Sequence, residues 1–167
     1  AQNLFGGFVY AGATMAFTAG YWSLAQHQPN KLCFLGCNMH YKSKGQTHFY
    51  GRGQPDPLRD DITLTSLKAS SYRMLIMAKM QGCDILSLSP GETNLHVPQT
   101  SFHKFLDYQA TFQISEIKVR QALKHEKKLN YYVEDGRYWL EEKLFCRNEL
   151  QKLDKIWIDA VMSDSLN

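Results

Sequence analysis

A short apolar run that opens into a long polar segment constrains the fold of this chain more than any other feature. The run Leu32–Leu35 stops at Gly36, and a stretch rich in His, Tyr, Asn, Gly and basic residues follows, as far as Gly53. In α/β proteins, ligands bind in the crevice past the carboxyl ends of parallel strands, on segments of this kind. Long connections inside a compact domain are uncommon and are usually either functional or disordered, and the many aromatic and imidazole side chains here favour function.

Two predicted helices alternate with two predicted strands in the first part of the chain. Apolar residues at three- and four-residue spacing predict helices over Tyr10–His27 and Ile62–Gln81. Each helix is followed by a short apolar run, Leu32–Leu35 and then Cys83–Leu88. Two strands joined through a helix are expected to be adjacent and parallel, with a right-handed crossover. The predicted fold class is α/β, with a partial Rossmann-like parallel sheet.

Local signals mark the ends of these helices. Asp60 and Asp61 are good N-caps for the second helix, and Gly82 is placed as its C′ residue. Pro29 prevents the first helix from continuing. Gly20 inside the first helix costs about 1 kcal/mol relative to Ala, which predicts that another element packs closely against it.

The character of the sequence changes after Pro98. Ile114–Leu129 and Tyr138–Met162 both have helical patterns, and Asp135 and Gly136 between them predict the turn of a C-terminal helical hairpin. We therefore expect a Rossmann-like part over residues 1–98, which could be one half of a larger domain, and a helical extension over residues 99–167.

The predicted hairpin carries more apolar surface than its own domain needs. Trp139, Trp157 and the apolar stripe within Leu140–Val161 lead us to expect a homodimer. The basic run Lys118–Lys128 lacks the interleaved aromatic residues of single-strand binders, and the net charge is only +3, so nucleic acid is not an expected partner.

Composition favours a cytoplasmic protein. No apolar run approaches the roughly 18 residues that span a bilayer, and the apolar stretch Gly12–Leu24 lacks the basic flank and cleavage pattern of a signal peptide. Association with the inner membrane surface stays open. The cysteines lie mostly in core-like segments, which favours reduced thiols. Cys33, Cys37, His40 and His48 match no standard zinc spacing, so no metal site is predicted.

His48 is the strongest candidate for catalysis. It lies between a hydroxyl residue and aromatic residues, and the ordinary pKa of imidazole suits a general base toward a sugar hydroxyl. Tyr41 and Tyr50 could donate hydrogen bonds to a phosphate, whose charge Arg52 and Lys42 could neutralise. A packing histidine, packing tyrosines and solvated basic residues remain the alternative reading of the same segment.

A helix start offers a second anion-binding element. Gly12 and Thr14 precede the apolar part of the first predicted helix, where free backbone N–H groups could bind a phosphate or nucleotide. Small residues are also common at helix starts without any ligand.

The order of these motifs resembles the bacterial sialyltransferases of glycosyltransferase family 42. The matching features are Gly12-x-x-Met15 on a helix, a strand ending at Gly36, Asn38-x-x-Tyr41, Thr47-His48-Phe49, and Ser89-Pro90 after the next strand. A similar Rossmann-like organisation occurs in the domain of unknown function 115 family, related to archaeal pterin pyrophosphokinases. The resemblance covers about residues 7–98.

This resemblance implies an inverting glycosyltransferase for surface-glycan biosynthesis. The donor would be a nucleotide sugar such as CMP-sialic acid, the second substrate a glycan acceptor, and no cofactor or metal would be required. His48 would be the base that deprotonates the acceptor, and Tyr41 would stabilise the departing phosphate. The expected substrate- or nucleotide-binding residues are Gly12, Thr14, Gly36, Asn38, Tyr50 and Arg52.

Two departures from the family pattern leave alternatives open. The family motif has Asp where this chain has Asn38, and its N-terminal Gly-Asn-Gly loop has no counterpart, which predicts an N-terminally truncated member that would be inactive alone. A pyrophosphokinase-like enzyme would need acidic metal ligands, for which Asp56, Asp60 and Asp61 are the candidates. A non-catalytic module that binds a partner is the third possibility.

Overall fold

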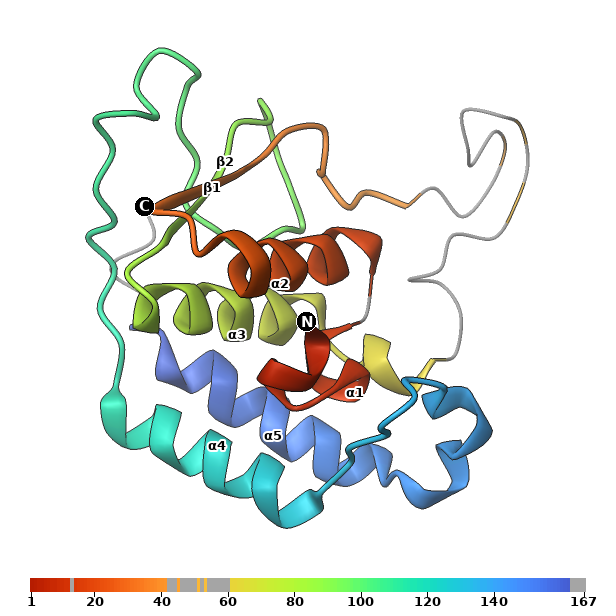
Figure 1. Ribbon diagram of the computed structural model, residues 1–167. Coiled ribbons are helices and arrows are strands. Elements are labelled where there is room, and N and C mark those ends of the chain that lie inside the picture. The colour runs from red at the N-terminus through yellow and green to blue at the C-terminus, as the bar shows by residue number, and fades with distance from the viewer. Residues whose placement is uncertain (13, 42–44, 46–50, 52, 54–60, 163–167) are drawn as a thin grey trace.

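The computed structural model describes the chain except for residues 13, 42–44, 46–50, 52, 54–60 and 163–167. The described part is mixed α/β, with five α-helices and a small parallel sheet (Figure 1). The α-helices and strands, in chain order, are α1 (Phe8–Ala11), α2 (Met15–His27), β1 (Lys31–Phe34), α3 (Leu67–Met80), β2 (Asp84–Ser87), α4 (Glu116–Leu129) and α5 (Arg147–Ala160). Short 3₁₀ turns are η1 (Gln2–Phe5), η3 (Ile62–Leu64), η4 (Tyr138–Leu140) and η5 (Glu142–Leu144).

The two strands pair as the sequence predicts. β1 and β2 are adjacent and parallel, with Lys31 opposite Asp84 and Phe34 opposite Ser87. In the described part of the chain the sheet consists of these two strands. Both carboxyl ends therefore lie at the same edge, and the segments that follow them must begin side by side.

Close packing at Gly20 is confirmed. A Cβ added to this residue would lie 2.7 Å from the Met74 Sδ and 3.2 Å from the Phe34 ring. α2 thus rests directly on β1 and α3, and only a glycine leaves room for both neighbours.

The predicted helix over Tyr10–His27 is interrupted. α1 ends at Ala11, and α2 begins at Met15 with the Thr14 hydroxyl accepting a hydrogen bond from the Phe17 N–H. A Cβ at Gly12 would lie 2.5 Å from the Phe8 carbonyl oxygen, so the backbone takes a bend there that only glycine tolerates. The cap and the bend together end one helix and start the next.

The second helix also begins later than predicted. Asp61 caps η3 by accepting from the Thr63 N–H, whereas Ser66 caps α3 by accepting from the Ala69 N–H. At the other end the prediction is confirmed, because Gly82 has φ +74° and follows the C-cap. The N–H groups of Gly82 and Cys83 donate to the carbonyls of Lys79 and Ala78, as in a Schellman motif.

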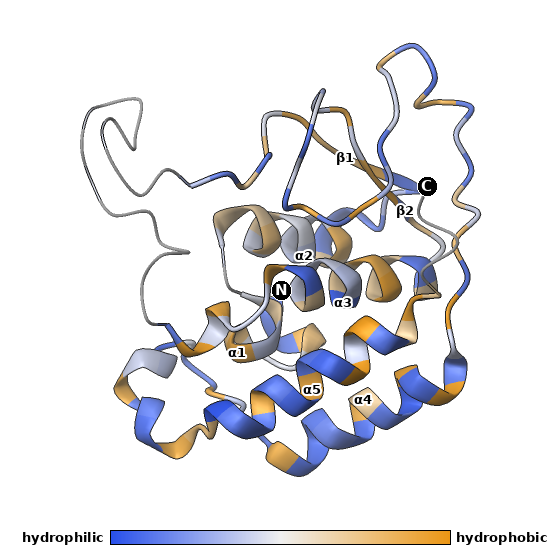
Figure 2. Cartoon of the chain, turned by 180° about the vertical axis from the view of Figure 1, so that it is seen from behind, coloured by the Kyte–Doolittle hydropathy of each residue, from blue (hydrophilic) through white to orange (hydrophobic). Residues whose placement is uncertain are grey.

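The last two helices pack along each other and run in opposite directions (Figure 1). α5 also packs on α3, and one hydrophobic core includes Phe17 and Leu75 as well as Leu153 and Trp157. Hydrophilic residues cover much of α4 and α5, with hydrophobic residues interspersed (Figure 2).

The helix predicted over Tyr138–Met162 is wrong in its first part. Residues 138–144 form η4 and η5, and α5 begins at Arg147. At about 100° per residue, a continuous helix would put Leu144 on a different face from Leu150 and Trp157. The buried stripe therefore cannot extend back to Leu144, which is exposed.

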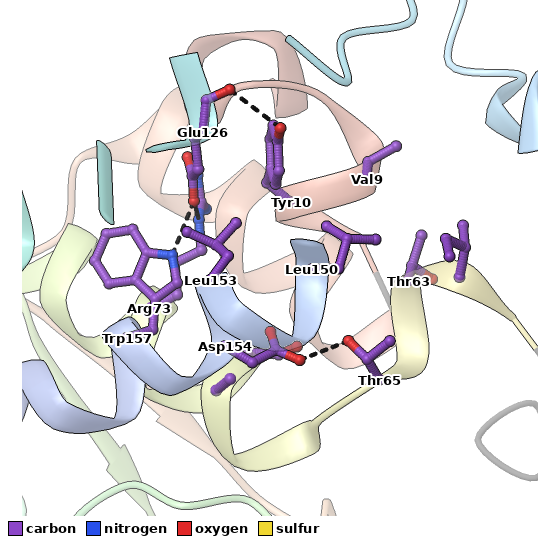
Figure 3. A pocket seen from close by; sticks show the side chains of 13 residues that line it. Val9, Tyr10, Thr63, Thr65, Arg73, Glu126, Leu150, Leu153, Asp154 and Trp157 are labelled. Atoms are coloured by element: carbon purple, nitrogen blue, oxygen red, sulfur yellow. Dashed lines mark hydrogen bonds and ion pairs between the residues drawn. The ribbon is translucent and has the colours of Figure 1, made fainter. Parts of the chain in front are cut away.

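A buried ion pair connects the helices. Arg73 on α3 donates from Nε to Glu126 Oε1 on α4 at 2.7 Å and from Nη2 to Oε2 at 2.9 Å. Its Nη1 donates to the Tyr21 hydroxyl, and its Nη2 also donates to the Phe5 carbonyl. Trp157 on α5 donates its indole N–H to Glu126 Oε1 at 2.9 Å (Figure 3).

We expect Arg73→Ala to destabilise the protein by about 3–5 kcal/mol, because it leaves the Glu126 carboxylate buried without its partner. Chemical unfolding measures the change. The control is Arg120→Ala, which removes an exposed pair with Glu116 of 3.8 Å and should cost less than about 1 kcal/mol. Equal losses for the two variants would contradict the central role of the buried pair.

Candidate functional site

The segments that follow β1 and β2 are joined by hydrogen bonds at the carboxyl edge of the sheet. The Gly36 N–H donates to the Ser89 hydroxyl at 2.8 Å. The Asn94 N–H donates to the Asn38 carbonyl at 2.8 Å, and the Asn94 side-chain amide donates to the Met39 carbonyl at 3.0 Å. Residues 36–40 and 89–99, which we call the carboxyl-edge segments, therefore form one unit.

Three further hydrogen bonds fix this unit. The Thr93 hydroxyl donates to the Asn38 carbonyl at 3.2 Å. The Thr93 hydroxyl oxygen in turn accepts from the Leu95 N–H at 3.0 Å. The His40 Nε2 lies 2.9 Å from the Glu92 carbonyl oxygen, which makes this nitrogen the donor. The second carboxyl-edge segment is thus held to the first through residues 89–94.

A cleft of about 580 Å³ opens on this unit. Its volume lies within the usual range for small-molecule sites. The polar residues of its wall are His40, Glu92, Thr93, Asn94, His96 and Gln99. Tyr72 of α3 adds an aromatic ring to the wall.

His96 occupies a defined position in the cleft. Its backbone N–H donates to the Ser71 hydroxyl at 3.2 Å, and its ring packs edge-on to the Tyr72 ring with 6.2 Å between centroids. Burial, and secondly the positive charge of Lys68, lower the pKa of the His96 imidazole below its ordinary value. The imidazole is therefore neutral at neutral pH and able to accept a proton or a hydrogen bond.

The structure brings together only some of the residues that the sequence singles out. Gly36 and Asn38 lie in the first carboxyl-edge segment, and Tyr41 follows directly. The Asn38 side-chain oxygen is buried and has no hydrogen-bond partner in the described part of the chain. The remaining candidates of that loop, His48, Tyr50 and Arg52, lie outside the described residues.

Gly12 and Thr14 have structural roles in the break between α1 and α2. The Thr14 hydroxyl caps α2, and Gly12 allows the close approach of the Phe8 carbonyl. These roles account for both residue types at the helix start, so nucleotide binding by them stays a prediction.

Sequence reasoning missed the residues contributed by the second carboxyl-edge segment. Glu92, Asn94 and His96 belong to no motif, and they follow a strand whose end is marked only by Ser89-Pro90. A signal was present nevertheless. If two parallel strands are predicted, polar residues after both of them must meet at one edge.

All four cysteines are free thiols, but Cys146 is exposed, unlike the core-like position expected for the cysteines. Among the described residues, no group of three or more His, Cys, Asp or Glu side chains could hold a metal ion. None of the helices in the described ranges is long and apolar enough to cross a membrane.

Comparisons of the chain with protein-family models, with curated proteins and with solved structures gave no match.

A second, smaller pocket lies between α1, η3, α3 and α5 (Figure 3). Its volume of about 30 Å³ is suited to a water molecule rather than to a substrate. Asp154 on its wall accepts a hydrogen bond from the Thr65 hydroxyl at 2.6 Å. Burial raises the pKa of the Asp154 carboxyl to about 6, although the bond from Thr65 acts in the opposite direction.

Asp154 should make stability depend on pH. Because its folded pKa lies above the unfolded value, its favourable contribution is complete below about pH 4 and is lost as pH rises through about 6. Asp154→Asn should therefore stabilise the protein at pH 7.5 relative to the wild type, by at most about 2–3 kcal/mol, and the gain should vanish near pH 4.

Urea unfolding at both pH values measures this difference. Asp159→Asn, which changes an exposed carboxylate on the same helix, is the matched control and should show no such pH dependence. A gain from Asp154→Asn that is equal at both pH values would contradict the raised pKa.

Proposed function

We propose that the protein is a sugar-nucleotide-dependent glycosyltransferase of the sialyltransferase-like, inverting type, with a role in surface-glycan biosynthesis. The observation that carries the proposal is the polar cleft past the carboxyl ends of two parallel strands. The segment after β1 that contributes to it also begins the stretch in which the family-like motifs lie. In this proposal β1, β2 and their helices are part of a Rossmann-like unit, and α4 and α5 are its helical hairpin.

The proposed reaction is a single displacement. His48 accepts the proton of an acceptor hydroxyl as its oxygen attacks the anomeric carbon of the donor sugar. The bond from that carbon to the phosphate oxygen breaks, and the nucleoside monophosphate leaves with the bonding electrons. Tyr41 donates a hydrogen bond to the departing phosphate. Gly12, Thr14, Gly36, Asn38, Tyr50 and Arg52 are the proposed donor-binding residues.

His48→Ala should lower turnover of CMP-sialic acid by about 10²–10⁴ and leave CMP binding nearly unchanged, because a general base contributes little to ground-state affinity. Tyr41→Phe should cost less, since it removes one hydrogen bond. CMP release with an acceptor panel measures turnover, and calorimetry measures binding.

His103→Ala, at an exposed position, is the control for this experiment and should behave as the wild type. Unchanged turnover in His48→Ala would remove the base assignment. Binding of ATP but not CMP would favour the pyrophosphokinase-like alternative, and binding of neither would favour a partner-binding module.

The proposed homodimer needs a revised interface. Trp157 is buried within the chain and cannot contribute, whereas Trp139, Leu140 and Leu144 are exposed on η4 and η5. We expect light scattering to give a dimer that Leu140→Asp converts to a monomer, because the substitution puts a charge into an apolar contact. Ile117→Asp, at another exposed apolar position on α4, is the control. A monomeric wild type at high protein concentration would contradict the dimer.

A further inference from the structure

We propose that the cleft at the carboxyl-edge segments binds a polyhydroxylated ligand, the acceptor sugar, and that His96 accepts a hydrogen bond from one of its hydroxyl groups. This inference rests on the proposed glycosyltransferase function and assigns one of its two substrates to this cleft.

The charge of the wall argues against the nucleotide as its occupant. In the described part of the chain no Lys or Arg lines the cleft, and Glu92 contributes a carboxylate. Lys68 lies close by, but its ammonium group is over the Tyr72 ring at 5.5 Å. Phosphate groups are usually bound by Arg or Lys, or by several free backbone N–H groups.

The hydrogen-bonding capacity of the wall is mostly acceptor capacity. One side-chain N–H of Asn94 donates to the Met39 carbonyl at 3.0 Å, and one of Gln99 donates to the Gly91 carbonyl at 2.9 Å. These contacts fix each amide and leave it one N–H donor and an oxygen with two lone pairs for a ligand. Thr93 uses its hydroxyl hydrogen on a carbonyl of the first carboxyl-edge segment.

A wall with more free acceptors than donors favours a ligand that carries donors as well as acceptors. Sugar hydroxyl groups both donate and accept, whereas phosphate oxygens at neutral pH almost only accept. Uncharged hydroxyl groups therefore complement this wall better than a nucleotide phosphate does, because the wall carries the Glu92 carboxylate and few donors.

The cleft wall has two imidazoles, His40 and His96. The His40 ring already bonds the Glu92 carbonyl, so His96 is the one that can offer its ring nitrogens to a ligand. Within the described residues no hydrogen bond reaches its ring nitrogens. Its backbone N–H donates to the Ser71 hydroxyl, and its ring packs edge-on to the Tyr72 ring. A neutral imidazole offers one donor and one acceptor, which matches a hydroxyl group. The lowered pKa of His96 supports this neutral form.

Two sugars could supply these hydroxyl groups, the acceptor or the sugar of the donor. NMR of the histidine ring signals of the whole chain separates them, with lactose, cellobiose and maltose as neutral probes and with CMP and CMP-sialic acid as donor probes. We expect at least one neutral disaccharide to shift the His96 signals, and CMP to leave them unchanged.

His96→Ala should weaken binding of that disaccharide about five- to tenfold, the effect of one net hydrogen bond, without changing CMP affinity. His103→Ala should change neither affinity. Thermal unfolding verifies that His96→Ala is folded, and His96→Gln, which keeps a donor and an acceptor, should restore part of the binding.

The outcomes separate this inference from the proposed function. If CMP shifts the His96 signals and no disaccharide does, the cleft is the nucleotide site and the inference is wrong, while the glycosyltransferase proposal stands. If only CMP-sialic acid shifts them, the ligand is the donor sugar and the acceptor assignment is wrong. If a disaccharide binds at His96 but no nucleotide binds anywhere, the sugar site stands and the glycosyltransferase proposal fails. Absence of every shift overturns the inference.

Discussion

The buried pair of Arg73 and Glu126 is the interaction on which the rest of the structure depends. Arg73 on α3 bonds Tyr21 on α2 and the Phe5 carbonyl of η1, while Glu126 on α4 accepts from Trp157 on α5. The Tyr10 hydroxyl on α1 donates to the backbone carbonyl of Glu126 at 3.2 Å. All five α-helices of the described chain therefore meet at one ion pair. A buried ion pair is tolerated in a core only when its polar atoms have hydrogen-bond partners. Here the Arg73 guanidinium donates hydrogen bonds to Glu126, Tyr21 and Phe5.

This interaction also determines where the cleft can form. Ser71 and Tyr72 directly precede Arg73 on α3, and they hold His96 through a hydrogen bond and a ring contact. Because Arg73 fixes the rotation of α3 in the core, its neighbours are directed toward the carboxyl edge of the sheet. The helical core and the candidate site are thus linked through three consecutive residues of one helix.

The sequence predicted those features that depend on local patterns. The parallel pairing of β1 and β2, the C′ position of Gly82 and the close packing at Gly20 all follow from short-range signals, and all are present. Helix boundaries were less predictable, because Thr14 and Ser66 act as caps inside apolar patterns that continue past them. The Arg73–Glu126 pair was not predictable, since its members are 53 positions apart and Glu126 lies in a run that is otherwise basic.

The candidate site was predicted only in part, because local motifs mark one of its two segments and not the other. The segment after β1 carries recognisable motifs, so Gly36, Asn38 and Tyr41 were singled out. The segment after β2 contributes His96 and Asn94 through tertiary contacts that no motif marks. A site built by two segments needs both strands to be considered together.

The central claim is that substrate binds at the carboxyl edge of the sheet. Its most direct test is hydrogen–deuterium exchange of the protein, measured with and without CMP-sialic acid and a neutral disaccharide. The account predicts slower exchange in residues 36–41 and 89–99, where backbone amides such as those of Asn94 and His96 line or support the cleft, and no change along α4. Protection confined to α4 and α5, or no protection of either carboxyl-edge segment with both ligands present, would contradict it.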